Sequence, residues 1–269
     1  MIPFNHDNYS KRFLSFLLYL APFQAGYINV GAFHIADGFF VSHVTGTSSM
    51  IGMGIGKLDL TIFVTFLTVL LSFILGASFA GYYLKYYKEI GREPRYSFVM
   101  FVKFLFFGII LLLSESDLFL TSKEVLYASH LLMLFLLSFC CGVQNSSSSI
   151  STGGFLKPTH MTGLSTDVGA NLYMFFIKSD SEEYEKLKTR IVILFSFILG
   201  GTLAELIFSI QGHYGFLFPF LTSFIFWFYS NQAVKKLRLK FGFIQVTLSL
   251  VLISTFAVGV VSFTANYIN

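Results

Sequence analysis

Residues 60–84 read LTIFVTFLTVLLSFILGASFAGYYL and contain no charged side chain. A helix needs about 20 mostly apolar residues to cross the hydrocarbon core of a bilayer, so this stretch is long enough to span it. Other long apolar runs lie at 13–35, 97–114, 125–145, 190–210, 214–231 and 241–264. The sequence therefore predicts an all-α integral membrane protein with about seven transmembrane helices.

The composition of the whole chain agrees with this class. Of the 269 residues, 55% are hydrophobic and 12% are charged, and the mean hydropathy is +0.71. Soluble domains carry about 25% charged residues, so an ordinary soluble enzyme and a disordered chain are both excluded. The net charge of +4 comes from basic residues in the turns between apolar runs. That distribution is typical of membrane topology, so we expect the lipid bilayer as a partner and no nucleic acid.

The basic turns also predict an orientation. The positive-inside rule assigns the N-terminus and the turns 85–96, 178–189 and 232–240 to the cytoplasm, and the acidic turn 115–124 and the C-terminus to the outside. Two further segments, 38–57 and 161–177, are interrupted by Gly, Ser, Thr and His. In this orientation each of these segments must enter and leave the membrane on the same side, so both are predicted to be re-entrant. We expect a multi-pass protein of the bacterial cytoplasmic (inner) membrane.

The sequence contains an internal repeat. Three blocks recur in the same order: Gly26-Tyr27-Ile28-Asn29 as Gly142-Val143-Gln144-Asn145, His43-Val44-Thr45-Gly46 as His160-Met161-Thr162-Gly163, and Ser72-Phe73-Ile74-Leu75-Gly76 as Ser196-Phe197-Ile198-Leu199-Gly200. The predicted repeats are 13–114 and 125–231, with 241–264 as an extra C-terminal helix of the single membrane domain. Each repeat has an odd number of crossings, which predicts the inverted topology of many secondary transporters.

These blocks resemble a known family. Ala25-Gly26-Tyr27-Ile28-Asn29, His43-Val44-Thr45-Gly46 and Gly142-Val143-Gln144-Asn145 are similar to motifs of the YoaK family, bacterial multi-pass membrane proteins classed as a domain of unknown function. The resemblance covers about residues 13–231. It implies membrane location and fold, and it implies no particular substrate or reaction.

The two interrupted segments carry the polar chemistry. In each, an extended stretch is expected to lead into a short helix of about 12 residues, with Thr45 and Thr162 as candidate N-caps. A helix N-terminus presents unpaired amides and about half a positive charge, which favours anions. If both helix starts lie near the membrane centre, they form one site for an anionic or strongly polar group. The alternative is that these residues only break and cap packed helices.

Polar residues near the two starts complete the predicted site. A histidine changes charge near neutral pH, so His43 and His160 are candidates for a proton-coupled step of transport. The alternative is that both histidines have only a structural role. Lys103 is expected to extend its side chain to the cytoplasmic interface. The candidate solute-binding residues are Asn29, His43, Thr45, Gly46, Ser48, Asn145, His160, Thr162, Gly163, Ser165 and Asp167.

The sequence thus favours a secondary transporter or channel-like carrier for a small polar or anionic solute. The chain lacks a Gly-x-Ser-x-Gly elbow, a His-Glu-x-x-His motif and a P-loop, so we expect no enzyme, no metal site and no cofactor. The alternative function is a membrane scaffold, receptor or assembly factor with the same fold. A water-filled cavity near the membrane centre would favour the carrier, and a filled centre the scaffold. Homo-oligomerisation is left open.

Overall fold

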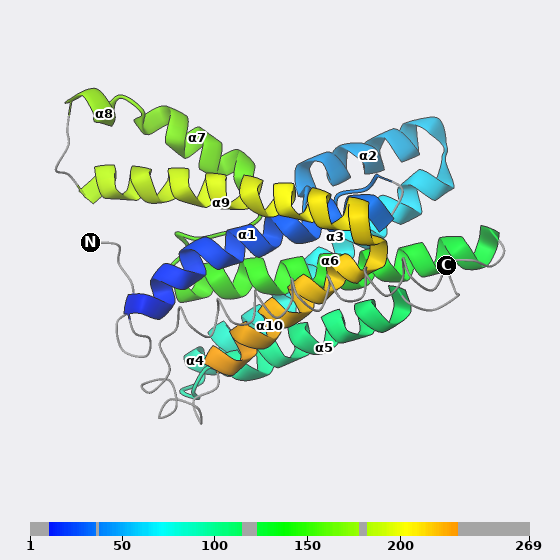
Figure 1. Cartoon of the computed structure of the whole chain (residues 1–269), viewed down its shortest axis with the longest axis horizontal. Coiled ribbons are helices and arrows are strands. Elements are labelled where there is room, and N and C mark those ends of the chain that lie inside the picture. Colours follow the sequence, from blue (N-terminus) through cyan, green and yellow to red (C-terminus); the bar gives the residue numbers. More distant parts are fainter. Residues whose placement is uncertain (1–10, 36–37, 115–122, 178–181, 231–269) are drawn as a thin grey trace.

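The computed structural model describes residues 11–35, 38–114, 123–177 and 182–230, and every regular element among them is helical (Figure 1). The elements are α1 (Lys11–Ile35), α2 (Val44–Lys57), α3 (Leu60–Gly81), the π-helical turn η1 (Tyr82–Tyr86), α4 (Tyr87–Glu89), α5 (Tyr96–Ser114), α6 (Lys123–Ser151), α7 (Met161–Asn171), α8 (Met174–Ile177), α9 (Glu182–Gln211), the 3₁₀ turn η3 (Gly212–Phe216) and α10 (Leu217–Ser230). The predicted C-terminal helix 241–264 and most of the acidic turn 115–124 lie outside the described residues.

Four helical segments in the described residues are long and apolar enough to cross a membrane: Leu60–Glu89, Tyr96–Ser114, Ala128–Ser151 and Glu182–Phe228. The last of them contains α9, η3 and all but the last two residues of α10. Apolar side chains also cover the outside of these helices, for example Leu112 at 72% exposure and Ile210 at 75%. Such a surface is stable against lipid and not against water. The described part of the chain is therefore an all-helical membrane protein.

Two helices extend further than the apolar runs suggest. α6 continues through the serines 146–149 to Ser151, and hydroxyls in this stretch are satisfied inside the helix by carbonyls one turn earlier, as Ser147 is by Val143 (2.5 Å). α9 begins at Glu182, before its apolar run. Lys186 pairs there with Glu183 (2.7 Å) and Glu182 (3.3 Å), and acidic residues in a first turn suit the helix dipole.

Glycines set the closest helix crossings. In the α1–α9 crossing, a Cβ placed on Gly26 would meet the backbone of Phe197, and one on Gly200 would meet the backbone of Phe23. In the α3–α6 crossing, Gly142 lies in the same way against Phe73, and Gly76 against Phe139. Small residues let helix backbones approach this closely within a membrane. Ser72, Gly76 and Ala80 of α3 are spaced by four residues and are all buried, so this stripe of small residues has a packing role.

The short helices α2 and α7 differ from the long ones in placement. Figure 1 shows both starting near the middle of the molecule and running toward opposite ends. They have 14 and 11 residues, so a short helix follows each histidine as expected. The basic turn around α4 lies at the same end as α8, and the α9–α10 junction lies at the other end (Figure 1).

Candidate solute-binding site

The starts of α2 and α7 have the same local geometry. His43 is the N-cap of α2 (φ −86°, ψ 64°), and His160 is the N-cap of α7 (φ −89°, ψ 59°). The predicted N-caps Thr45 and Thr162 are therefore wrong: both threonines lie within the first helical turn. Neither histidine caps its helix through a side-chain hydrogen bond. Because amides of a first turn have no partner inside their own helix, both starts present donors and a partial positive charge.

Gly46 and Gly163 make room for the histidine rings. A Cβ on Gly46 would lie 2.6 Å from Nδ1 of His43, and a Cβ on Gly163 would overlap the ring of His160. Each imidazole thus folds back over the first turn of its own helix. The spacing His-x-x-Gly in both repeats follows from this contact, and it gives the two glycines a steric role beside the predicted binding role.

The matched asparagines hold the chain just before each histidine. Oδ1 of Asn29 accepts hydrogen bonds from the backbone amide and the hydroxyl of Ser42, both at 3.1 Å. Oδ1 of Asn145 accepts one from the backbone amide of Thr159 at 3.2 Å. Because irregular backbone needs such partners when it is withdrawn from water, the two asparagines position the two helix starts.

Both helix starts line one cavity of about 370 Å³. This volume lies in the range of small-molecule pockets. The lining residues come from the start of α2, the start of α7, the serine run of α6 and a patch of α3: Ser42, His43, Val44, Thr45, Phe73, Ala77, Asn145, Ser146, Ser149, Ile150, Lys157, Thr159, His160, Met161 and Thr162. Lysine, histidine and hydroxyl side chains are present, and the lining residues of the described chain include no carboxylate. The cavity therefore suits an anion or a polar solute.

The structure brings five of the predicted site residues onto this cavity, namely His43, Thr45, Asn145, His160 and Thr162. The other six lie elsewhere. Gly46 lies under the ring of His43. Asn29 is buried behind Ser42, and Ser48 bonds back to the carbonyl of Val44 (2.9 Å).

The remaining three predicted residues lie further along α7. Ser165 is exposed. Gly163 and Asp167 line a second cavity, where Asp167 lies 3.5 Å from Nε of Arg190.

A polar network missed by the sequence analysis centres on Lys103 of α5. Its side chain is fully buried, so the expected extension to the interface is wrong. Nζ donates to Oε1 of Gln24 on α1 (2.5 Å) and to Oε1 of Gln144 on α6, and it lies 5.0 Å from the ring of Phe226. Among the described residues no carboxylate pairs with it. Lys103 is the one charged residue in the run 97–114, which is the signal that marks it in the sequence.

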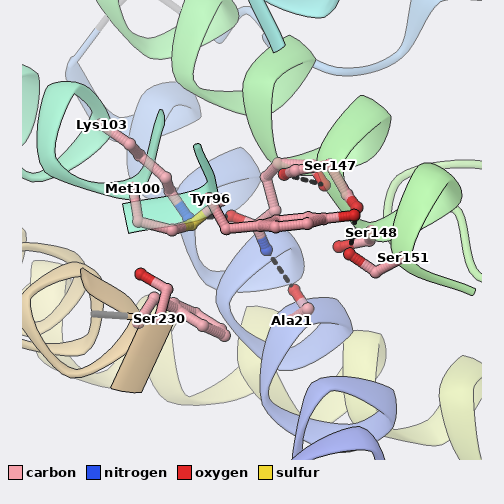
Figure 2. Close-up of a pocket in the computed structure, with 10 residues that line it drawn as sticks. Ala21, Tyr96, Met100, Lys103, Ser147, Ser148, Ser151 and Ser230 are labelled. Atoms are coloured by element: carbon pink, nitrogen blue, oxygen red, sulfur yellow. Dashed lines mark hydrogen bonds between the residues drawn. The ribbon is translucent and has the colours of Figure 1, made fainter. Parts of the chain in front are cut away.

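The network borders a space of about 30 Å³ between α5, α6 and α10. Figure 2 shows Lys103, Met100 and Tyr96 across from the serines of α6, with Ser230 and Ala21 nearby. A space of this size holds about one water molecule. The same glutamines continue the network: Gln24 donates to Thr222 (2.6 Å) on α10, and Gln144 to the carbonyl of Ala21 (2.6 Å). Lys103 therefore ties α1, α5, α6 and α10 together.

Fold and site together define a multi-pass helical membrane protein with a polar cavity between two short helices. The chain matches the model of DUF1275, a family described as protein of unknown function, over residues 17–229. It belongs to that family. This match supports the expected membership of an uncharacterised membrane family. No curated protein and no solved structure matches the chain.

Proposed function

We propose that this protein is a secondary transporter or channel-like carrier for a small anionic or polar solute. The solute binds in the 370 Å³ cavity, between the starts of α2 and α7. The observation that carries the proposal is this shared cavity, since a scaffold needs no polar space between two helix starts. Binding and translocation, rather than catalysis, are its function.

The cavity favours an anion for electrostatic reasons. The positive ends of two helix dipoles converge on it, and Lys157 adds a full positive charge. His43 and His160 place imidazole nitrogens at the same surface, where they either orient the solute or take up a proton with it. Thr45 and Thr162 add hydroxyl donors, one from each repeat.

An inverted repeat is part of the proposal, and paired contacts support it. The contact of Gly26 with Phe197 corresponds to that of Gly142 with Phe73, because both members of each pair are matched in the sequence repeat. The hydrogen bond from Ser42 to Asn29 corresponds in the same way to that from Thr159 to Asn145. In this arrangement α2 and α7 are re-entrant, and the carrier alternates by movement of one repeat against the other.

The proposed topology can be tested by labelling. With Glu93→Cys in the turn before α5, a membrane-impermeant maleimide should react only after the membrane is permeabilised. With Tyr214→Cys in η3, it should react in intact cells. The native Cys140 and Cys141 are buried and give little background. Reaction of both engineered cysteines from the same side would reject the proposed topology.

Transport itself can be tested without knowing the natural solute. Proteoliposomes are exposed to potassium nitrate, formate, chloride or sulfate with valinomycin, or to urea or glycerol, and volume changes are followed by light scattering. We expect at least one solute to cross faster than in protein-free liposomes. The double variant Thr45→Val/Thr162→Val should slow that solute by about tenfold or more, because two hydroxyl hydrogen bonds are lost.

The matched control is Thr189→Val/Thr202→Val. Neither threonine lines the cavity, and their hydroxyls bond to carbonyls of their own helix, those of Glu185 and Ile198. The control should retain wild-type rates. If both double variants slow the solute equally, the cavity is not part of the route by which the solute crosses the membrane. If every solute crosses at the protein-free rate, the carrier proposal fails and the scaffold alternative is favoured.

A further inference from the structure

A second cavity, of about 230 Å³, lies between α7 and α9 and the segment that precedes α7. It shares Lys157 and His160 with the first cavity. Its other lining residues are Gly154, Phe155, Leu156, Gly163, Leu164, Asp167, Arg190 and Ile193. Arg190 is the residue that none of the functions described so far uses.

The guanidinium of Arg190 is only partly satisfied. The side chain is 17% exposed, and its Nε lies 3.5 Å from Oδ2 of Asp167, which is a long ion pair. The guanidinium carbon lies 5.7 Å from the centre of the Phe155 ring. Nη1 is buried and has no hydrogen-bond partner among the described residues. A buried donor without a partner has lost its water and gained nothing in exchange, so this geometry is expected where a ligand supplies the missing acceptor.

The charges around the cavity specify the kind of acceptor. Arg190 and Lys157 contribute two positive charges, and Asp167, whose side chain is 55% exposed, contributes one negative charge. A guanidinium presents donors in a planar fork that matches the oxygens of carboxylate, phosphate and sulfate.

We infer that the cavity between α7 and α9 is an oxyanion-binding site in which Arg190 and Lys157 hold the ligand. This inference goes beyond the proposed transport and does not depend on it, because binding is measured in the absence of flux. Two sources supply this chemistry, namely a free inorganic oxyanion and the phosphate of an anionic lipid headgroup. Asp167 competes with the ligand for Arg190 and so limits its affinity.

The test measures the thermal unfolding midpoint of the full chain in a neutral detergent. Sodium sulfate and sodium phosphate are titrated against sodium chloride at equal ionic strength. The wild type should show a saturable rise in the midpoint, since a ligand that binds only the folded state stabilises it. Arg190→Gln should weaken the apparent affinity by about tenfold to a hundredfold, because charge-assisted hydrogen bonds are lost. Sulfate also stabilises proteins in general, so the difference between wild type and variant is the readout.

The matched control is Lys188→Gln. Lys188 lies two residues away on the same helix and outside the cavity lining, so this variant should show the same midpoint rise with sulfate and phosphate as the wild type. Asp167→Asn provides a second variant that does not depend on the stability of Arg190→Gln: it frees the guanidinium and should tighten sulfate binding.

In nanodiscs, replacing phosphatidylcholine by phosphatidylglycerol distinguishes a lipid headgroup from a free oxyanion as the ligand. If phosphatidylglycerol raises the midpoint of the wild type but not of Arg190→Gln, and free sulfate and phosphate raise neither, the ligand is a lipid headgroup. Wild type, Arg190→Gln and Asp167→Asn with the same response to every oxyanion would overturn the inference.

Discussion

Replacing Gly76 by Leu should unfold the membrane domain or leave it unable to assemble. Gly76 lies where α3 crosses α6, and any side chain there would overlap the backbone of Phe139. A backbone cannot move aside as a side chain can, so the two helices must separate. We expect a loss of at least about 3 kcal/mol in the free energy of unfolding, the upper end of the usual cost of overpacking. Reversible unfolding in mixed micelles with increasing SDS measures it.

Gly81→Leu is the matched control for this substitution. Gly81 ends the same helix, and a Cβ placed there meets nothing within 4 Å. The control should change stability by less than about 1 kcal/mol, as most substitutions away from packed features do. Gly200→Leu, against the backbone of Phe23, should repeat the loss seen with Gly76→Leu. Similar stabilities of Gly76→Leu and Gly81→Leu would show that the crossing tolerates separation.

Gln144→Leu should be the most damaging change in the polar network. It removes an acceptor of the buried Lys103 and leaves Gln24 as its remaining side-chain acceptor among the described residues. It also removes the donor to the carbonyl of Ala21 (2.6 Å). Breaking the partner of a buried charge typically costs about 3–5 kcal/mol, because the charge keeps its desolvation penalty. The same unfolding measurement in micelles tests this expectation.

A second substitution shows whether the charge is the cause. Lys103→Met keeps an unbranched stem of the same length and removes the ammonium, so adding it to Gln144→Leu should restore part of the lost stability. Thr68→Val, on α3 and outside the network, serves as an unrelated second substitution and should restore none. If the double variant with Lys103→Met is less stable than Gln144→Leu alone, the buried charge is not the source of the loss.

Several local features of the site could be predicted from the sequence. The short helices after His43 and His160 are present as predicted: in both repeats an irregular break precedes a run of small and apolar residues that is long enough for about three helical turns. Each N-cap was predicted two residues too late, at Thr45 instead of His43 and at Thr162 instead of His160. Thr45 and Thr162 are favourable capping residues, but Asn29 and Asn145 hold the preceding chain so that the helices begin directly after the histidines.

The buried state of Lys103 could not be predicted from its neighbours in the chain. A lysine in an apolar run extends to the interface or turns inward, and the choice depends on what faces it. Its partners Gln24 and Gln144 are 79 and 41 residues away in the sequence. The same holds for Arg190, whose surroundings come from α7 and the segment before it.

By itself the sequence determined the class of the protein. Hydropathy over a window of helix length is a local property, and a helix that is apolar over that length is stable in a bilayer whatever its tertiary contacts. The sequence also determined which residues are matched between the two halves. Only the tertiary structure decided which polar groups meet. The glycine crossings bring α1 against α9 and α3 against α6. His43 and His160 line one cavity, Lys103 lies between two glutamines, and a nitrogen of Arg190 has no partner among the described residues, since each of these arrangements depends on side chains from different helices.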